Sequence, residues 1–252
     1  MTGARQPPDW LVARPIAHRG LHERAAGVVE NSPAAARAAI ERGFAVECDV
    51  QLTRDGNAVV FHDFTLERLT AAAGAVAERS AAELTGLELR GSTDRIPTLD
   101  ALLGQLAGRV PLVCEVKSRF DGDVRLADRV AAAAAAYPGP LAIKSFDPAV
   151  VAHLRGLDLP NPLGLVAQAD HSDPSWGALQ AGTRQGFAGF LHYADTRPDF
   201  LSYRVDDLPH AVPHLFRAAL GLPVMGWTVR TPDQRQRAAR WADQMVFEGF
   251  TP

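Results

Sequence analysis

Residues 46 to 63, VECDVQLTRDGNAVVFHD, constrain the fold and chemistry of this chain more than any other stretch. Glu47 and Asp49 alternate with apolar residues, and side chains alternate faces along a strand, so the two carboxylates share one face. A turn rich in Asp and Gly follows, and a second short apolar strand leads back to His62. The pattern indicates either a metal site with a proton-transferring histidine beside it or an amphipathic edge hairpin with a polar outer face.

The composition is typical of a globular protein with a sizeable core. The chain has 252 residues, 47 % of them hydrophobic, so we expect a single domain over residues 1–252. A net charge of −3 gives no general attraction to nucleic acid or anionic membranes, and neither is an expected partner. No signal peptide or bilayer-spanning apolar run is recognisable, which predicts a cytoplasmic protein without a stable membrane anchor. Nothing indicates an oligomeric state.

Cys48 and Cys114 are expected to be buried thiols on neighbouring strands.

Strand and helix patterns alternate along the chain, which predicts parallel strands joined by helical crossovers. The eight expected strands lie near residues 14–17, 44–50, 110–116, 141–146, 163–167, 199–205, 222–229 and 244–247. Eight such units favour a (β/α)8 TIM barrel over an open doubly wound sheet. A helix is expected from about 174 to 194, although three glycines interrupt it. Residues 64–97 break the rhythm and are expected to form a short insertion after the second strand unit, packed on the domain as a lid or substrate collar.

Polar residues stand where most of these strands end, and functional residues of barrels gather at the carboxyl ends of strands. They are His18, Arg19, Glu47, Asp49, His62, Glu115, Lys117, Lys144, Tyr203, Trp227 and Glu248. Each alone has an ordinary structural explanation, but their joint placement at one rim favours a functional site. The remaining histidines (His22, His153, His171, His192, His210 and His214) lack this context and are expected to be surface or packing residues.

These residue types suit phosphoryl chemistry. Glu47, Asp49 and Glu115 offer only oxygen ligands, which favours one hard divalent cation, Mg²⁺ or Ca²⁺, over zinc. Cationic side chains next to such an ion attract an anionic group. His18 and His62 could flank that group, one taking a proton and the other giving one.

The motifs His18-Arg19-Gly20, Glu30-Asn31, Glu47-x-Asp49-Val50, His62-Asp63, Glu115-x-Lys117, Ser145-Phe146-Asp147 and Trp227-Thr228-Val229 resemble the glycerophosphodiester phosphodiesterase family in content and order. The resemblance implies a (β/α)8 barrel whose insertion is residues 64–97. It also implies metal-dependent cleavage of a small-molecule glycerophosphodiester to an alcohol and sn-glycerol 3-phosphate.

The resemblance implies a role for each matching residue. Glu47, Asp49 and Glu115 would be metal ligands, and His18 and His62 the acid–base pair. Arg19 and Lys117 would contact phosphate, and Trp227 would form an apolar wall. Asn31, Lys144, Tyr203 and Glu248 are further candidates for substrate contacts.

Two positions depart from the family pattern. Glu248 stands where the family ending Thr-Asp-x-Pro commonly has its Asp, and Lys144 precedes Ser145 where an uncharged residue is expected. Lys144 either points into the barrel mouth or packs outward under a helix, with its ammonium group reaching solvent.

Three functions fit the residues. The first is hydrolysis of glycerophosphodiesters. The second is a lysophospholipase D-like or cyclising reaction at the same site, because related barrels of the phosphatidylinositol-phospholipase and sphingomyelinase type use a similar histidine pair. The third is a catalytically silent barrel that binds a phosphorylated ligand or a protein partner. The complete set of histidines and carboxylates favours the first.

Overall fold

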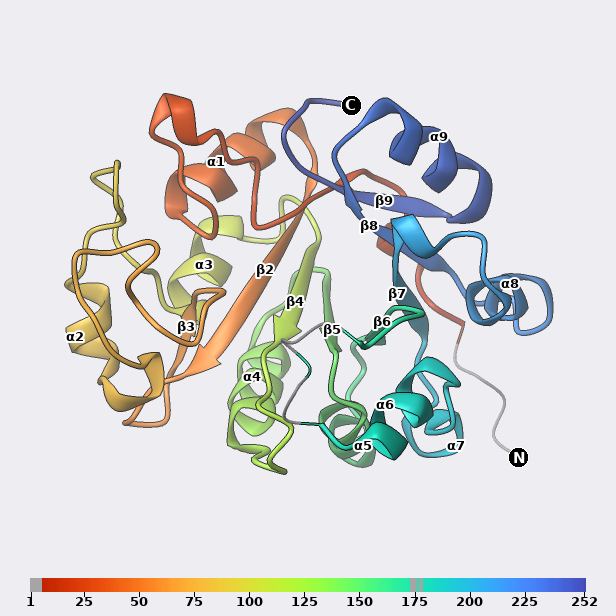
Figure 1. The fold of residues 1–252 in the computed structure, drawn as a ribbon. Helices are drawn as coiled ribbons and strands as arrows, with labels where there is room; N and C mark the ends of the chain where they lie inside the picture. Colours follow the sequence, from red (N-terminus) through yellow and green to blue (C-terminus); the bar gives the residue numbers. More distant parts are fainter. Residues whose placement is uncertain (1–5, 173–175, 177–178) are drawn as a thin grey trace.

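The structure of the chain, a computed structural model, describes residues 6–172, 176 and 179–252. The strands are β1 (Ile16–Ala17), β2 (Ala45–Leu52), β3 (Ala58–Val60), β4 (Leu112–Val116), β5 (Leu141–Ser145), β6 (Leu163–Ala167), β7 (Phe200–Arg204), β8 (Val224–Val229) and β9 (Gln244–Phe247). All except β3 are parallel, in the order β1-β9-β8-β7-β6-β5-β4-β2, and the pairing of β1 with β2 closes the ring. The predicted eight-stranded parallel barrel is therefore confirmed (Figure 1). Strand β3 adds antiparallel to β2.

Helices cover the outside of the barrel (Figure 1). They are α1 (Pro33–Arg42), α2 (Ala81–Thr85), α3 (Leu99–Leu106), α4 (Arg125–Ala136), α5 (Pro148–Gly156), α6 (Ala181–Ala188), α7 (Tyr193–Thr196), α8 (Ala211–Ala218) and α9 (Pro232–Trp241). Ser32, Thr98 and Thr231 cap α1, α3 and α9, because each side-chain oxygen accepts a hydrogen bond from a backbone N–H of the first turn. None of the described helices has the length and apolar character needed to cross a bilayer.

The helix expected from about 174 to 194 is not continuous. Residues 174, 175, 177 and 178 lie outside the described part of the chain, and the rest of the range contains the separate helices α6 and α7. Gly189 ends α6, and Phe190 has a φ of 58°, in the left-handed region. A left-handed residue cannot continue a right-handed helix, so the chain turns here and begins α7.

An apolar layer fills the barrel near the N-terminal ends of its strands. It consists of Leu11, Ile16, Ala45, Val113, Ala142, Phe200, Met225 and Val246. Two positions further along seven of the strands, and therefore on the same face, stand His18, Glu47, Glu115, Lys144, Ser202, Trp227 and Glu248. Because side chains alternate along each strand, a layer of mainly polar residues lies above the apolar layer. This polar layer is at the C-terminal ends of the strands, where the active sites of barrel enzymes form.

The outward faces of the strands pack under the helices in the main hydrophobic core. Cys48 and Cys114 lie directly opposite each other in this core, because they are register partners of β2 and β4. Both are buried and free, as predicted. A hydrogen bond with Cys114 and burial raise the pKa of the Cys48 thiol well above its ordinary value, so it is a protonated packing residue.

The insertion of residues 64–97 packs on the barrel through a hydrophobic cluster of its own. Leu66, Leu69, Val76, Leu84, Leu89 and Ile96 meet Val29, Val59 and Phe61 there. The predicted packing of the insertion is confirmed. Its scattered leucines therefore anchor the segment beside β3, where Figure 1 shows α2 at the side of the barrel.

Candidate active site

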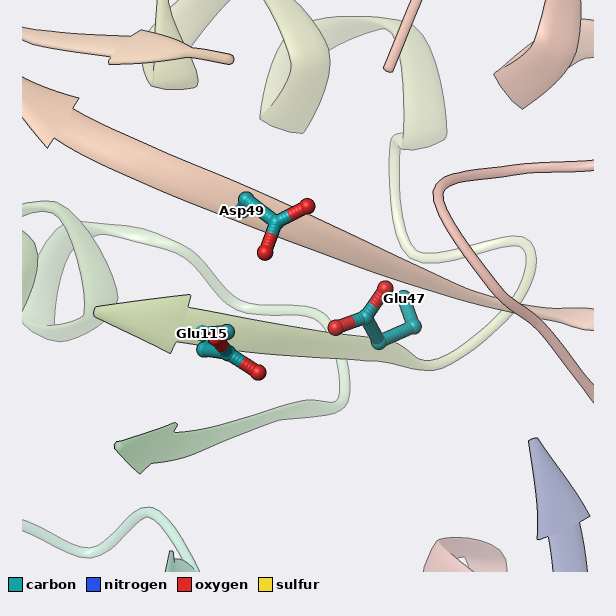
Figure 2. Close-up of side chains that lie close together, drawn as sticks. All are labelled: Glu47, Asp49 and Glu115. Atoms are coloured by element: carbon teal, nitrogen blue, oxygen red, sulfur yellow. The ribbon is translucent and has the colours of Figure 1, made fainter. Parts of the chain in front are cut away.

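Three carboxylates from neighbouring strands meet at the carboxyl end of the barrel. Glu47 and Asp49 project from β2 and Glu115 from β4, with Asp49 and Glu115 paired in register. One oxygen of each lies within 4.8 Å of the other two, and Figure 2 shows the three groups beside one another over the two strands. All three residues are 5 % exposed or less. Buried carboxylates at this separation repel one another and require positive charge close by.

Two lysines supply part of that charge. The Nζ atom of Lys144 lies 3.0 Å from Glu47 Oε1 and 3.2 Å from Glu115 Oε2. The Nζ atom of Lys117 lies 3.1 Å from Glu115 Oε1 and 3.6 Å from Asp49 Oδ1. Of the two orientations considered for Lys144, the structure has the inward one. Burial alone would lower the pKa of Lys144, but Glu47 and Glu115 raise it above its ordinary value, so the ammonium group is charged.

Asp49 is held from its other side by Arg19 and Asn31. Arg19 Nε lies 3.2 Å from Asp49 Oδ2, and Asn31 Nδ2 donates to the same oxygen at 3.0 Å. Burial alone would raise the pKa of Asp49, but Lys117, Arg19 and the two site histidines hold it well below its usual range. The structure therefore places Asn31, an expected substrate contact, against a carboxylate of the cluster.

The turn after β1 brings Arg19 to this position. Gly20 has a φ of +80°, and a Cβ added there would lie 2.8 Å from the Cβ of Ala35. Glycine is the one residue that meets both constraints. The turn directs the backbone N–H of Arg19 at Glu47 Oε2, which accepts its hydrogen bond at 3.0 Å.

The carboxylate cluster fits a divalent cation. Glu47 Oε1 is buried and accepts no hydrogen bond from the described residues, but the ammonium group of Lys144 lies 3.0 Å away and forms an ion pair with it. Three buried carboxylates whose oxygens lie within 4.8 Å of one another are the donor set of a hard cation. Glu47, Asp49 and Glu115, the residues predicted as ligands, are thus the ones brought together.

His18 is paired with Glu248, whose Oε2 atom is hydrogen-bonded to His18 Nδ1. Arg230 Nε donates to Oε1 of the same carboxylate at 2.6 Å, and His22 Nε2 lies 3.6 Å from Oε2. Burial alone would raise the pKa of Glu248, but these hydrogen bonds hold it well below its usual range. Glu248 was expected to contact substrate; here it contacts a histidine. The loop after β1 carries His22, expected to be a surface or packing residue, to the same carboxylate.

His62 is paired with the residue that follows it. Its Nδ1 atom lies 2.8 Å from Asp63 Oδ1. Arg68, from the insertion, donates to Asp63 and also to both oxygens of Glu30, at 2.9 and 2.7 Å. Glu30 accepts from Arg19 at 2.6 Å. A continuous chain of ion pairs therefore joins His62 to Arg19, and Arg68 of the insertion is its central member.

The site residues surround a cavity of about 350 Å³. Both histidines, Arg19, Asp49, Glu115 and the two lysines line it together with Phe146, Val166, Gln168, Arg204, Asp206, Trp227, Thr228 and Arg230. Phe146 and Trp227 form its aromatic wall, with ring centroids 5.4 Å apart in a T-shaped arrangement. The sequence interpretation missed Gln168, Arg204 and Arg230; the position of Arg204 at the end of β7 was the available signal.

Tyr203, another expected substrate contact, does not line this cavity. It is 1 % exposed, belongs to the core under the helices, and its hydroxyl group lies 2.9 Å from His210 Nδ1. The reason is alternation along β7, which turns Ser202 and Arg204 inward and Tyr203 outward. The prediction chose the wrong face of the strand by one residue.

Acid is expected to weaken the site through Glu30. Burial alone would raise the pKa of Glu30, but Arg68 and Arg19 lower it to about 2. Because the folded-state pKa lies below the ordinary value of 4.5, the contribution to stability is complete above pH 4.5 and is lost as the pH falls towards 2. The difference in free energy of unfolding between the native protein and Glu30→Gln should shrink over this interval, from at most about 3 kcal/mol.

Urea denaturation of both proteins from pH 7 to pH 3 measures this difference. Glu88→Gln is the matched control, because Glu88 is exposed and its ion pair with Arg95 is 3.9 Å long; it should change stability little at any pH. An equal difference for Glu30→Gln at pH 3 and pH 7 would contradict the assignment.

The fold and site define a (β/α)8 barrel protein whose carboxyl rim combines a buried cluster of three carboxylates with two carboxylate-paired histidines. The sequence profile of the glycerophosphoryl diester phosphodiesterase family matches residues 18–250, a range that includes all of these residues. The chain belongs to this family.

Known relatives agree with this assignment. A glycerophosphodiester phosphodiesterase of Caldanaerobacter subterraneus subsp. tengcongensis is 38 % identical over 111 residues, which cover 41 % of this chain and 44 % of that protein. The chain thus aligns with less than half of that relative's length. An Oleispira antarctica phosphodiesterase, solved with the product sn-glycerol-3-phosphate, has a TM-score of 0.77 at 21 % identity, covering 94 % of this chain and 93 % of that one. A Thermotoga maritima glycerophosphodiester phosphodiesterase has a TM-score of 0.70 at 23 % identity, covering 92 % of each chain. Both structures share the fold.

Proposed function

We propose that the protein hydrolyses glycerophosphodiesters to an alcohol and sn-glycerol 3-phosphate, with the help of one divalent cation. The proposal rests on the two histidines that line the cavity. The Nδ1 atom of each is hydrogen-bonded to a carboxylate, and Asp49 and Glu115 of the carboxylate cluster line the same cavity. The product found in the Oleispira antarctica relative supports the identity of the released phosphate.

Cations bind the phosphate in this proposal. Glu47, Asp49 and Glu115 would hold the metal, which supplies positive charge to the non-bridging oxygens of the phosphodiester. Arg19 and Lys117 line the same cavity and present a guanidinium and an ammonium group to those oxygens. Because both groups are already fixed by ion pairs with Asp49 and Glu115, little reorganisation is needed as charge develops.

The histidines move the protons. Glu248 and Asp63 accept from the Nδ1 atoms of His18 and His62, which leaves each Nε2 for the substrate. One imidazole takes the proton of the attacking hydroxyl group, and the other gives a proton to the oxygen of the departing alcohol. The attacking hydroxyl group belongs to water in simple hydrolysis and to the glycerol moiety in the cyclising alternative.

A row of aromatic rings favours lysophospholipids as a second substrate class. From the cavity wall at Phe146, Trp176 follows with centroids 5.5 Å apart, and Phe120 lies 5.7 Å from both Trp176 and Phe187. These rings are half-buried. An acyl chain on the glycerol moiety would have an apolar surface there.

The test is release of glycerol 3-phosphate from sn-glycero-3-phosphocholine and sn-glycero-3-phosphoethanolamine, with Mg²⁺, with Ca²⁺ and with EDTA. A His18→Ala/His62→Ala protein prepared in parallel reports contaminating phosphodiesterases. Metal-dependent release above that background is the expected result. Lysophosphatidylcholine as a third substrate distinguishes the second class: choline release from it alone would shift the assignment to a lysophospholipase D-like enzyme. No release from any of the three by folded protein would overturn the proposal.

A further inference from the structure

Lys144 lies in the site, but the proposed hydrolysis gives it no role. It is 3 % exposed and stands at the level of the carboxylates, because β5 pairs it in register with Glu115. The chain contains only two lysines, Lys117 and Lys144, among 26 basic residues. Both of them contact the carboxylate cluster.

The contacts of the two lysines form an alternating series. Lys144 bridges Glu47 and Glu115, and Lys117 bridges Glu115 and Asp49. Arg19 pairs with the other side of Asp49. Each carboxylate of the cluster therefore already has a cationic side chain beside it before any metal arrives, so a divalent cation must compete with these side chains.

The two lysines differ in how closely they contact their carboxylates. Lys117 has a looser second contact, 3.6 Å from Asp49, and its side chain is 14 % exposed. Lys144 contacts both of its carboxylates within 3.2 Å. One of these contacts is to Glu47 Oε1, the buried oxygen that accepts no hydrogen bond from the described residues. The ammonium group of Lys144 thus occupies the approach to the oxygen that a metal would use.

We propose that Lys144 is an internal counter-ion of the carboxylate cluster, which holds Glu47 and Glu115 together in the metal-free protein and competes with the divalent cation for them. The inference rests on the proposed metal site. It explains how three buried carboxylates stay assembled without metal. It also assigns this buried lysine the role of weakening metal affinity.

Lys144→Met tests the competition directly, because methionine fills a similar volume without the charge. Isothermal titration with Mg²⁺, and Mn²⁺ binding followed by electron paramagnetic resonance, should show at least about tenfold tighter binding, since a unit charge near the ion is removed. In EDTA the melting temperature of the variant should fall, because Glu47 and Glu115 face each other without a cation between them. The rise in melting temperature on adding Mg²⁺ should exceed that of the native protein.

Arg155→Met is the matched control. Arg155 on α5 pairs with the buried carboxylate of Asp199 at 2.9 Å, and Asp199 precedes β7, at the opposite end of the barrel. This variant also loses the counter-ion of a buried acid, so it should lower the melting temperature. It should leave the Mg²⁺ affinity and the Mg²⁺-induced rise unchanged.

The lysine signals give a second measurement that is independent of activity. Protein labelled with ¹³C and ¹⁵N only in lysine gives two side-chain signals, and Lys144→Met removes one of them, which assigns both. The Lys144 signal should shift as Mg²⁺ saturates the site. If Lys144→Met is poorly folded in EDTA, Lys144→Gln provides the same comparison with a polar side chain.

The outcomes separate this inference from the proposed function. Metal bound by Lys144→Met but not by the native protein would support the competition in its strongest form. Equal or weaker binding by both neutral variants would overturn it, as would a Lys144 signal that stays unmoved in native protein shown by titration to have bound Mg²⁺. Hydrolysis is measured separately, so loss of turnover with unchanged metal affinity would instead make Lys144 a substrate contact.

Discussion

Replacement of His62 by alanine is expected to lower turnover of glycerophosphocholine by roughly two to four orders of magnitude, the usual contribution of a general acid or base. His62 lines the cavity, and its Nδ1 lies 2.8 Å from Asp63, so the side chain is oriented for proton transfer. Among the ion pairs of the described residues, His62 contacts Asp63 and none of the three clustered carboxylates. Mg²⁺ affinity and melting temperature should therefore stay close to those of the native protein. Steady-state kinetics at saturating substrate and metal measure the loss.

His153→Ala is the control for this variant. His153 also pairs with an aspartate, Asp128, at 2.7 Å, but this pair lies on the helices outside the barrel. Its loss should leave turnover unchanged. If His62→Ala retained native turnover, His62 would have no part in proton transfer, and His22 would be the next histidine to test.

The barrel and most of its site follow from one local rule, the alternation of side chains along a strand. The rule places Glu47 and Asp49 on one face without knowledge of the fold, and it places their neighbour Cys48 in the outer core. The same rule fixes Lys144, because Leu141 and Ile143 are large apolar residues that pack under the helices. The two orientations considered for Lys144 could thus have been reduced to the inward one from the sequence.

Alternation fails where the end of a strand is uncertain by one residue. The sequence places Tyr203 at the polar end of its strand, but the inward residues of β7 are Phe200, Ser202 and, at the cavity, Arg204. Knowing that Phe200 belongs to the inner apolar layer would have shown that Tyr203 points outward. Placing Phe200 in that layer requires the register between β7 and its neighbours. Register is a tertiary property and is not encoded in any local pattern.

Loop residues could not be predicted in this way. His22 lies close to Glu248 although 226 positions (22 to 248) separate them in the sequence, and Arg68 ties Asp63 to Glu30 from within the insertion. Both contacts depend on how a turn directs the chain, for which strand periodicity offers no signal. The pairing of His18 with Glu248 has the same origin, since it needs β9 to lie beside β1 in a closed barrel.

Replacement of Glu47 by alanine is expected to weaken Mg²⁺ binding by about 100-fold or more, because loss of a ligand exceeds the roughly 10–100-fold cost of losing an outer partner. Glu47 is fully buried, and one of its oxygens accepts no hydrogen bond from the described residues. Isothermal titration measures the change. Asp199→Ala, which removes a buried acid at the opposite end of the barrel, should lose stability but keep the native affinity. Native affinity in Glu47→Ala would exclude Glu47 as a ligand.

Glu47→Ala and Lys144→Met act on one ion pair from opposite sides, so their effects on metal affinity should have opposite signs. If Lys144 weakens binding chiefly by occupying Glu47, its removal helps little once Glu47 is gone. The double variant should then bind Mg²⁺ about as weakly as Glu47→Ala alone, and the two effects would not add. Full additivity would mean that Lys144 acts independently of Glu47, through its contact with Glu115 or through space. The cycle thus distinguishes direct competition at Glu47 Oε1 from these other effects of the ammonium group.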